Sequence, residues 1–344
     1  MNEKIGAVPK KKFFFVVLSL AVSVLLIGLL FSRIQTKDLT RTLANLHWPS
    51  LFAYIGISLF SAWLRAWRYK WLLQPRPISW GNMFLVTFIR NCFDDLLPAR
   101  IGSLSYIYVL NKRLEFSFES AASTFVVAFV YDFLTLSPFL ALAIFIVGLG
   151  TSAVSTPGLL ASSLLFFLII FIILWQIIPI LRVLLRIYQF LLRLVKANNN
   201  KKARHSMAKL QMAVDSVAEI RKRRIDVPLF LLSLLIRLGK YASLYFLLFS
   251  LLRSHGFSLR DLSFWKTILG ITGAEMTSAL PIKGLADFGT WESAWAVAFL
   301  LMNFEAGLAV ISGIGVHLIT NLFEYGLGFL SILILAVPYL KRKA

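Results

Sequence analysis

The stretch LPARIG, residues 97–102, and the stretch LPIKG, residues 280–284, interrupt two long apolar segments of this chain. Each contains a proline, which cannot continue a helix, followed by a cation and a glycine. Apolar segments that are broken at corresponding places in two halves of a chain are the best sequence pointer to a binding site between transporter repeats. The two stretches are therefore the strongest clue in the sequence to fold and function.

The composition indicates a membrane protein. Of 344 residues, 58% are hydrophobic and 15% are charged, and the mean hydropathy is +0.77. Several apolar runs are long enough to cross about 30 Å of hydrocarbon as helices. These runs are residues 13–31, 51–73, 118–147, 158–180, 228–251 and 305–337. We therefore expect an all-α polytopic membrane protein with about six full transmembrane helices, one for each run, in a single integral membrane domain over residues 1–344.

The two interrupted segments, residues 81–110 and 262–303, are also apolar. Each could be one proline-kinked span or a re-entrant hairpin of two half-helices, because irregular backbone at membrane depth must line protein or water. We favour hairpins. With a cytoplasmic N-terminus, the two hairpins then enter the membrane from opposite faces, which predicts an inverted-repeat-like architecture with both tips near the midplane.

The formal net charge of +20 is concentrated in a few clusters. Residues 181–227 hold 12 Lys and Arg against three acids, and further clusters lie at residues 10–12 and 341–343. The positive-inside rule places such clusters in the cytoplasm, where anionic headgroups attract them. We therefore expect an integral plasma (inner) membrane protein with both termini cytoplasmic, whose charge partner is the anionic cytoplasmic leaflet and not a nucleic acid.

Residues 181–227 form a basic cytoplasmic insert in this topology. Met207, Leu210, Val214 and Val217 recur at spacings of three and four, as on an amphipathic helix. Such a helix lies on the headgroups or packs under the bundle. The alternative is a docking surface for a biosynthetic enzyme.

Three cations lie at or near the hairpin tips, namely Arg90, Arg100 and Lys283. An ionised side chain at this depth is costly unless it is paired or hydrated, and a substrate phosphate would satisfy it. In the alternative the cations pair with nearby acids and lock the tips. These acids are Asp94, Asp95 and Asp287.

Arg65 and Arg68 lie three residues apart and share a helix face. Arg68 is close to the basic end of its span, where it could snorkel to headgroups. We therefore prefer Arg65 as a substrate-binding residue.

Arg237 and Lys240 share a face of the 228–251 span, deeper than a snorkelling side chain needs to be. They require partners or water. Asp132 and Glu275 are candidates for coupling or pairing with them.

In the last span His317, Asn321 and Glu324 recur at helical spacing as one polar stripe. Such a stripe could relay protons or couple transport to a gradient, because His and a buried Glu can both titrate near neutrality. Interhelical hydrogen bonding is the simpler alternative, since polar residues often hold membrane helices together.

Glu292 follows Gly289-Thr290, where we expect the second half-helix of the 262–303 segment to begin. A carboxylate in a first turn is stabilised by the unpaired N–H groups and by the helix dipole. We expect a second role in substrate binding, in which Glu292 pairs with Lys283 or Arg65 when the site is empty.

Three motifs resemble those of one known family. They read WLRAWRYKW (residues 63–71), LLPARIG (96–102) and LPIKGLADFGTWE (280–292). In this order they resemble the lysylphosphatidylglycerol synthase transmembrane-region family, also called flippase-like domains, over most of the chain. The resemblance implies a stand-alone member, without the soluble synthase domain, that binds or moves a membrane lipid with an anionic headgroup or a polyprenyl phosphate between leaflets.

The function favoured by these observations is that of a membrane lipid flippase with a cationic midplane site. The alternatives are an integral membrane transferase and an accessory scaffold that acts with an enzyme of lipid or lipid-linked glycan synthesis. A transferase needs a catalytic constellation, and Asp94-Asp95 is the only adjacent acidic pair. Cys92 is the single cysteine, so no Cys-cluster metal site can form. We expect no enzymatic activity, no metal and no cofactor.

Overall fold

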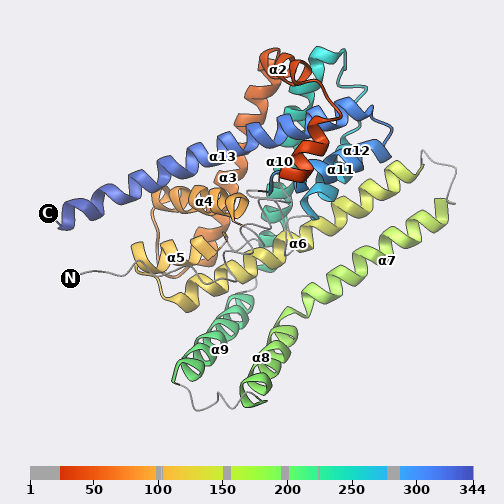
Figure 1. The fold of residues 1–344 in the computed structure, drawn as a ribbon. Coiled ribbons are helices and arrows are strands. Elements are labelled where there is room, and N and C mark those ends of the chain that lie inside the picture. The colour runs from red at the N-terminus through yellow and green to blue at the C-terminus, as the bar shows by residue number, and fades with distance from the viewer. Residues whose placement is uncertain are drawn as a thin grey trace. The chain divides into compact units, whose positions relative to one another are not determined.

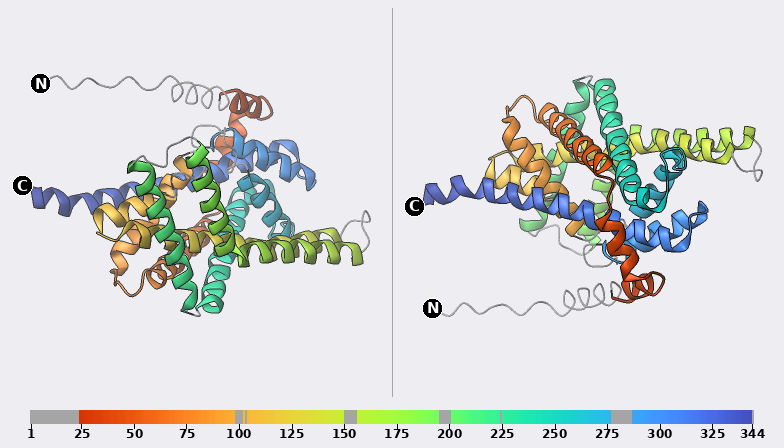
Figure 2. Two further views of the ribbon diagram at one scale, coloured as in Figure 1. Left: turned by 90° about the horizontal axis from the view of Figure 1, so that it is seen from below. Right: turned by 90° about the horizontal axis from the view of Figure 1, so that it is seen from above.

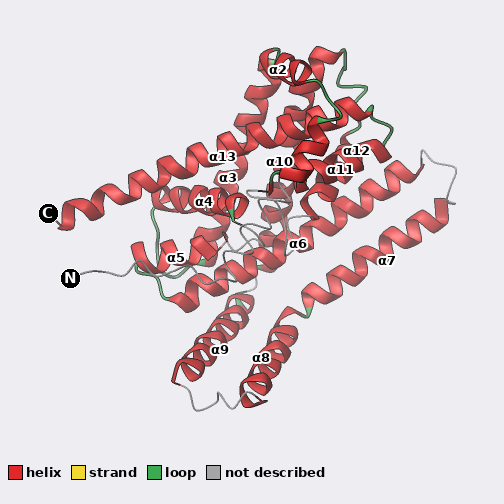
Figure 3. Ribbon diagram, in the orientation of Figure 1, coloured by secondary structure: helices red, strands yellow, loops and turns green. Residues whose placement is uncertain are grey.

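The computed structural model describes residues 24–97, 102, 104–149, 156–194, 201–223, 225–276 and 287–343. Every regular element in these residues is a helix (Figure 3). The chain forms two compact units. The first unit comprises Met1–Phe52, Asn91–Ser103 and Leu244–Gly328, and the second comprises Ala53–Arg90, Leu104–Ser243 and Phe329–Ala344.

The helices are labelled in Figure 1, and residues 24–31 form one more before them. In chain order they are α2 (Thr36–Ala44), α3 (Trp48–Leu72), α4 (Trp80–Leu96), α5 (Leu104–Arg113), α6 (Phe118–Leu149), α7 (Thr156–Trp175), α8 (Ile177–Leu194), α9 (Lys201–Lys222), α10 (Asp226–Leu252), α11 (Phe264–Met276), α12 (Thr290–Leu301) and α13 (Ala306–Lys343). A short 3-10 helix, Arg253–His255, follows α10. The longest is α13, which is uninterrupted in both views of Figure 2.

Three of these helices are long and apolar enough to cross a membrane. The candidate spans are Phe118–Gly148 in α6, Asp226–His255 beginning with α10, and Ala306–Ala336 in α13. They correspond to three of the runs identified in the sequence. The prediction of an all-α membrane protein is therefore confirmed.

The predicted run 158–180 is not one helix. A turn at Gln176 separates α7, which ends at Trp175, from α8, which begins at Ile177. The cause is Pro179, which has no backbone N–H to donate to the carbonyl of Trp175 four residues earlier. The expected boundary of this run was therefore wrong, because α8 already begins inside it.

The first interrupted segment forms two helices, α4 and α5. Residues 98–101, which include Arg100, lie outside the described residues. Gly102 lies against α4 so closely that a Cβ atom there would overlap the backbone of Phe93. The glycine of the LPARIG stretch is therefore required by this close approach. α5 has ten residues, about 15 Å of helix, and is too short to cross the hydrocarbon alone.

The second interrupted segment also forms two helices, α11 and α12, which pack against each other. Gly270 faces the ring of Phe299 and Gly273 faces Ala298, so the helices are antiparallel. Each is under about 20 Å long. The helix–break–helix pattern is what a re-entrant hairpin requires, and the placement of both hairpins in the membrane stays a prediction. Residues 277–286, with Lys283, lie outside the described residues.

The basic insert forms a helical pair, α8 and α9, in the second unit (Figure 1). The helix predicted around Met207 to Val217 is present as α9. Val214, Val217 and Ile220 are buried, and α9 packs on α6. One face of α9 thus belongs to the core of the second unit.

Candidate functional site

Four arginines and one aspartate come together in the second unit, and we call them the arginine cluster. They are Arg65 and Arg68 of α3, Arg90 of α4, Asp132 of α6 and Arg237 of α10. Their charges act on one another: Arg65 is repelled by Arg90 and attracted by Asp132. Helices far apart in the sequence therefore supply one charged site.

Apolar contacts hold α3 against α10 beside the cluster. Leu64 packs with Leu232 and Ile236, and Trp63 and Trp71 cover this contact. Leu64 directly precedes Arg65, and Ser233 lies between Leu232 and Ile236. The apolar packing therefore sets the positions of Arg65 and Ser233. The arginines therefore project from a rigid frame.

Arg68 and Asp132 form a short ion pair. The Nη1 atom of Arg68 donates to Oδ1 of Asp132 at 2.7 Å and to Oγ of Ser233 at 2.9 Å. The side chain of Arg68 is 0% exposed and that of Asp132 is 24% exposed. The Nε and Nη2 atoms of Arg68 are buried and have no hydrogen-bond partner among the described residues. One edge of this guanidinium is thus unsatisfied.

Arg237 adds a further positive charge to the cluster. Its Nη2 atom donates to the backbone carbonyl of Asp132, and its guanidinium lies 6.0 Å from the ring centroid of Tyr241. The charge of the Asp132 carboxylate acts on Arg68, Arg65 and Arg237. One carboxylate cannot neutralise both Arg68 and Arg237.

The cluster lies at mid-depth along two candidate spans. Asp132 is about 21 Å from the start of α6 and about 25 Å from its end, at 1.5 Å per residue. Arg237 is about 17 Å from the start of α10 on the same basis. Ionised groups at such depth are costly unless they are paired, hydrated or bound to a ligand.

Arg68 does not extend to headgroups, as its position near the end of α3 suggested it could. Its side chain is completely buried beside Asp132. The sequence does contain a signal for this burial: Asp132 is a single carboxylate in the middle of an apolar helix. Such a carboxylate needs a buried cation as its partner. Ser233 was missed because a serine in a membrane helix carries no such signal. Arg237 lies beside Asp132, the partner suggested for it.

A second buried polar contact lies in the first unit. Nδ1 of His317 on α13 and Oε1 of Glu292 on α12 are 2.6 Å apart, and both side chains are buried. The rings of Phe288 and Trp291 cover the imidazole, with centroids 4.7 and 5.0 Å from it. This contact ties α12 to α13. It is the interhelical bond that the sequence offered as the simpler role for His317.

Glu292 also caps its helix. α12 begins at Thr290, as predicted, and the N–H of Gly289 donates to Oε2 of Glu292 at 2.8 Å. In the structure Glu292 contacts His317. Its expected pairing with Lys283 or Arg65 stays a prediction, and Lys283 lies outside the described residues. The carboxylate has two oxygens, and the cap and the imidazole use one each.

The acids that flank the interrupted segments gather around a tyrosine in the first unit. The charges of Asp95, Asp287 and Glu324 all act on Tyr325 of α13. Asp287, with φ of +63°, occupies the left-handed region that few residues other than glycine, asparagine and aspartate adopt. Asp95 and Asp287 adjoin, along the chain, the two stretches that contain Arg100 and Lys283, whereas Glu324 directly precedes Tyr325 on α13.

The other predicted residues are placed as follows. Asp94 lies in the last turn of α4, Glu275 in the last turn of α11, and Lys240 one turn after Arg237 on α10. Asn321 is buried on α13. The roles proposed for them from the sequence stay predictions. No group of three or more His, Cys, Asp or Glu residues suited to a metal occurs among the described residues.

A family model described as the lysylphosphatidylglycerol synthase TM region matches residues 16–328. The match covers nearly the whole chain, including the arginine cluster and the Glu292–His317 contact. No curated protein matches the chain.

Proposed function

The chain belongs to the lysylphosphatidylglycerol synthase transmembrane-region family, and from that premise we propose that it moves an anionic or lipid-linked substrate between the leaflets of the membrane. The family and the apolar helices identify a membrane protein related to lipid synthesis or flipping. The transport activity, the class of lipid and the residues that bind it are our proposal.

One observation carries this proposal: Arg68, Arg237 and Asp132 form a positively charged set at mid-depth of candidate spans. A protein gains nothing in stability from a surplus buried cation, since desolvating a charge is costly and is offset only by good pairing. A phosphate that arrives at the set supplies the missing negative charge. Arginine suits this task because its planar guanidinium can hold two phosphate oxygens at once.

Arg68 has the geometry for such an exchange. Its Nη1 atom is engaged by Asp132 and Ser233, whereas Nε and Nη2 form the opposite edge and are the two donors a phosphate can take together. Because Arg68 is fully buried, lipid access belongs to another state of the transport cycle. In that state the phosphate competes with Asp132 for the guanidinium, and Asp132 restores the pair after release.

The remaining candidates complete the proposed site. Arg65 and Arg90 raise the local positive potential, and Arg100 and Lys283 act at the hairpin tips as expected from the sequence. Glu292 and His317 hold α12 on α13, so that the second hairpin keeps its shape when its tip binds substrate. We propose no catalytic role for any of these residues, and no cofactor.

The anionic cytoplasmic leaflet is the second proposed partner, with both termini in the cytoplasm of an inner membrane. Six apolar side chains of α8 are exposed: Val183, Leu184, Ile187, Phe190, Leu191 and Leu194. They recur at spacings of three and four and so form one face, and the exposed Arg182, Arg186 and Arg193 run alongside it. Such a helix lies in the interface plane, with apolar side chains among the acyl chains and arginines at the headgroups.

Native mass spectrometry of the purified protein tests the proposed site. Wild-type protein should carry a co-purified anionic lipid or polyprenyl phosphate. The Arg68→Gln variant should carry one lipid fewer per protein, with occupancy at the arginine cluster about tenfold lower, since it removes a charge-assisted bidentate contact. Lys112→Gln is the matched control, because it removes an exposed charge at the end of α5. Equal lipid occupancy in Arg68→Gln and Lys112→Gln would exclude Arg68 from the site. A bound lipid-linked glycan that the protein converts to a product would instead favour a transferase.

A further inference from the structure

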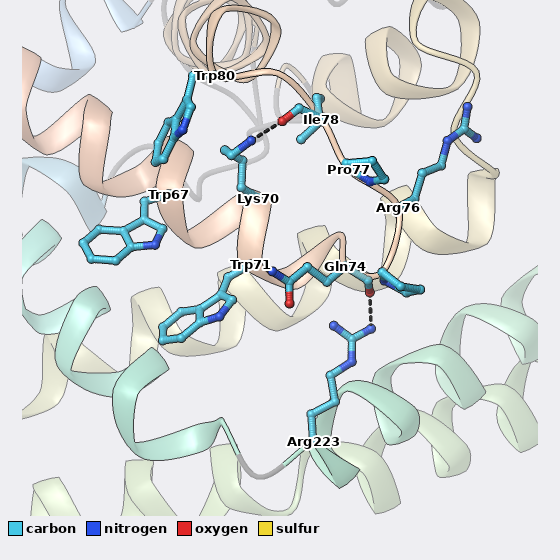
Figure 4. A pocket seen from close by; sticks show the side chains of 10 residues that line it. Trp67, Lys70, Trp71, Gln74, Arg76, Pro77, Ile78, Trp80 and Arg223 are labelled. Carbon is cyan, nitrogen blue, oxygen red and sulfur yellow. Dashed lines mark hydrogen bonds between the residues drawn. The ribbon is translucent and has the colours of Figure 1, made fainter.

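A cavity of about 550 Å³ lies where α3 gives way to α4 in the second unit (Figure 4). Its walls are the last two turns of α3, the connection of residues 73–79, the start of α4, and Arg223, which directly follows α9. Cavities that hold small ligands have volumes of about 300–1,000 Å³. The cavity is thus large enough for a lipid headgroup.

The sequence explains why this cavity is open. Pro75 and Pro77 keep the connection out of the helix, since neither has a backbone N–H. The last carbonyl groups of α3 therefore need other donors. Arg223 supplies them, with Nη1 bonded to the carbonyl of Leu72 at 3.4 Å and Nη2 to that of Gln74 at 2.5 Å. Figure 4 shows its guanidinium pointing to Gln74 from the opposite wall.

Lys70 and Arg223 keep donors available for a ligand. An ammonium group has three N–H donors and a guanidinium has five. Lys70 donates to the carbonyl of Ile78, and Arg223 donates to two carbonyl groups. Carbonyl oxygens do not neutralise a charge, and neither cation is paired with a carboxylate in the part of the chain that the structure describes. Two cations thus face one cavity with unused N–H groups.

Arg76 does not add to this charge. Its guanidinium points away from the cavity in Figure 4 and lies 4.6 Å from the ring centroid of Phe116. It donates to the carbonyl of Glu115. Only the stem of Arg76 contributes to the wall.

Tryptophan rings form the apolar side of the cavity. The ammonium of Lys70 lies 4.9 Å from the ring centroid of Trp80, and Trp67 stacks on Trp71 at 6.3 Å. Trp67 and Trp80 line the cavity and are 40% and 42% exposed. Tryptophan next to Lys and Arg at the end of a membrane helix is typical of the lipid–water interface.

We propose that this cavity binds the phosphodiester headgroup of a membrane glycerophospholipid. The phosphate oxygens lie between Lys70 and Arg223, and the glycerol backbone and first acyl carbons cover Trp67 and Trp80. A free phosphate would match the two cations but would leave both indole rings in water, so the aromatic wall favours the lipid. The bound headgroup joins the α3–α4 connection to the α9–α10 connection.

This site is separate from the arginine cluster and does not depend on transport. Arg68 directs its guanidinium to Asp132, whereas Lys70, two residues later, directs its ammonium to Ile78. A lipid can therefore occupy the cavity whether or not the protein exchanges lipids between leaflets.

Photo-crosslinking tests the proposal with full-length protein in nanodiscs. The probe is phosphatidylglycerol with a diazirine next to the glycerol on one acyl chain, and mass spectrometry locates the adducts. Adducts should concentrate in residues 67–80. The double variant Lys70→Gln with Arg223→Gln should reduce adducts there by about tenfold and leave those elsewhere unchanged. Lys112→Gln with Arg253→Gln, which removes two exposed charges, is the control and should crosslink like wild type.

Undiminished crosslinking at residues 67–80 in the folded double variant would overturn the proposal. Displacement of the probe by millimolar inorganic phosphate would also overturn it, because the cavity would then be a free-phosphate site. Should the loss of Arg223 unfold the protein, Lys70→Gln alone leaves the carbonyl contacts of Arg223 intact and should lower the adducts about threefold. An unchanged yield of adducts at residues 67–80 in Lys70→Gln would also overturn the proposal.

Arg68→Gln separates this site from the proposed transport site. It should retain full crosslinking at residues 67–80 even if it abolishes lipid exchange. Loss of these adducts in Arg68→Gln, but not in the double variant, would place the lipid at the arginine cluster and contradict a second site.

Discussion

Arg68 lies four residues before the end of α3, within reach of headgroups, yet its guanidinium is buried beside Asp132. From the sequence, such an arginine could snorkel, because the spacing shows its position along its own helix but not which side chains of other helices lie next to it. The partner is 64 residues away, and only the packing of α3 on α6 and α10 brings the two together. The need for a partner was predictable from Asp132, but the identity of the partner was not.

Asp132→Asn tests the arginine cluster by stability. The variant leaves the buried Arg68 without a counter-charge and removes the charge that attracts the half-buried Arg237, so it should lower the free energy of unfolding by about 3–5 kcal/mol. Thermal unfolding in detergent measures this loss. Glu219→Gln, an exposed change on α9, is the control and should stay within about 0.5 kcal/mol of wild type. A wild-type melting temperature for Asp132→Asn would show that the arginines do not depend on this carboxylate.

At the scale of helices, the breaks were predictable where proline and glycine act locally. The stretches at 97–102 and 280–284 separate α4 from α5 and α11 from α12, as their residues indicate. The break at Gln176 also has a local signal, Pro179, but it was missed because residues 177–180 are as apolar as the residues before them and hydropathy alone merges the two helices. The spacing of His317, Asn321 and Glu324 suggested an interhelical hydrogen bond for His317, but it did not identify Glu292 of α12 as the partner.

Glu292 variants separate its cap from its charge. Glu292→Gln keeps an oxygen for the N–H of Gly289 and an amide for His317, so it should cost about 1 kcal/mol or less. Glu292→Ala removes both bonds and should cost about 2–4 kcal/mol. Chemical unfolding of the two variants in detergent gives the comparison. Equal losses would mean that the contact of the carboxylate with His317, and not the capping bond, holds α12.

Spin labels on α8 test its place in the interface. In a Cys92→Ala background, a label at Phe190→Cys should be more accessible to oxygen than to a water-soluble nickel complex, because this face of α8 should lie among acyl chains. A label at the exposed polar Glu219→Cys on α9 should show the opposite preference. Equal nickel accessibility at both sites would place the exposed face of α8 in water.

For the whole molecule, the predicted topology rests on loop charge and on the two broken segments. The structure supplies helices too short to cross alone, namely α5, α11 and α12, but the side from which each hairpin enters depends on the bilayer. Basic residues flank α5, whereas Asn303 follows α12 in a stretch without Lys or Arg. The charge bias thus assigns the two segments to opposite faces.

Cysteine labelling decides this assignment. In a Cys92→Ala background, Lys112→Cys should react with an impermeant maleimide only after the cytoplasmic side is opened, and Asn303→Cys should react in intact cells. Both positions are exposed, so a lack of reaction reports the membrane and not burial. Labelling of Lys112→Cys from outside would contradict the opposed hairpins.

Leaflet exchange in vesicles is the most direct test of whether Arg68, Arg237 and Asp132 carry an anionic lipid across the membrane, as we propose. Purified protein is reconstituted with head-labelled phosphatidylglycerol, and an impermeant quencher reports how much lipid reaches the outer leaflet over time. Wild type and Lys112→Gln should exchange the lipid well above the protein-free rate, whereas Arg68→Gln should fall at least about tenfold, since one bidentate phosphate contact is lost. Wild-type exchange by a folded Arg68→Gln variant would contradict the claim.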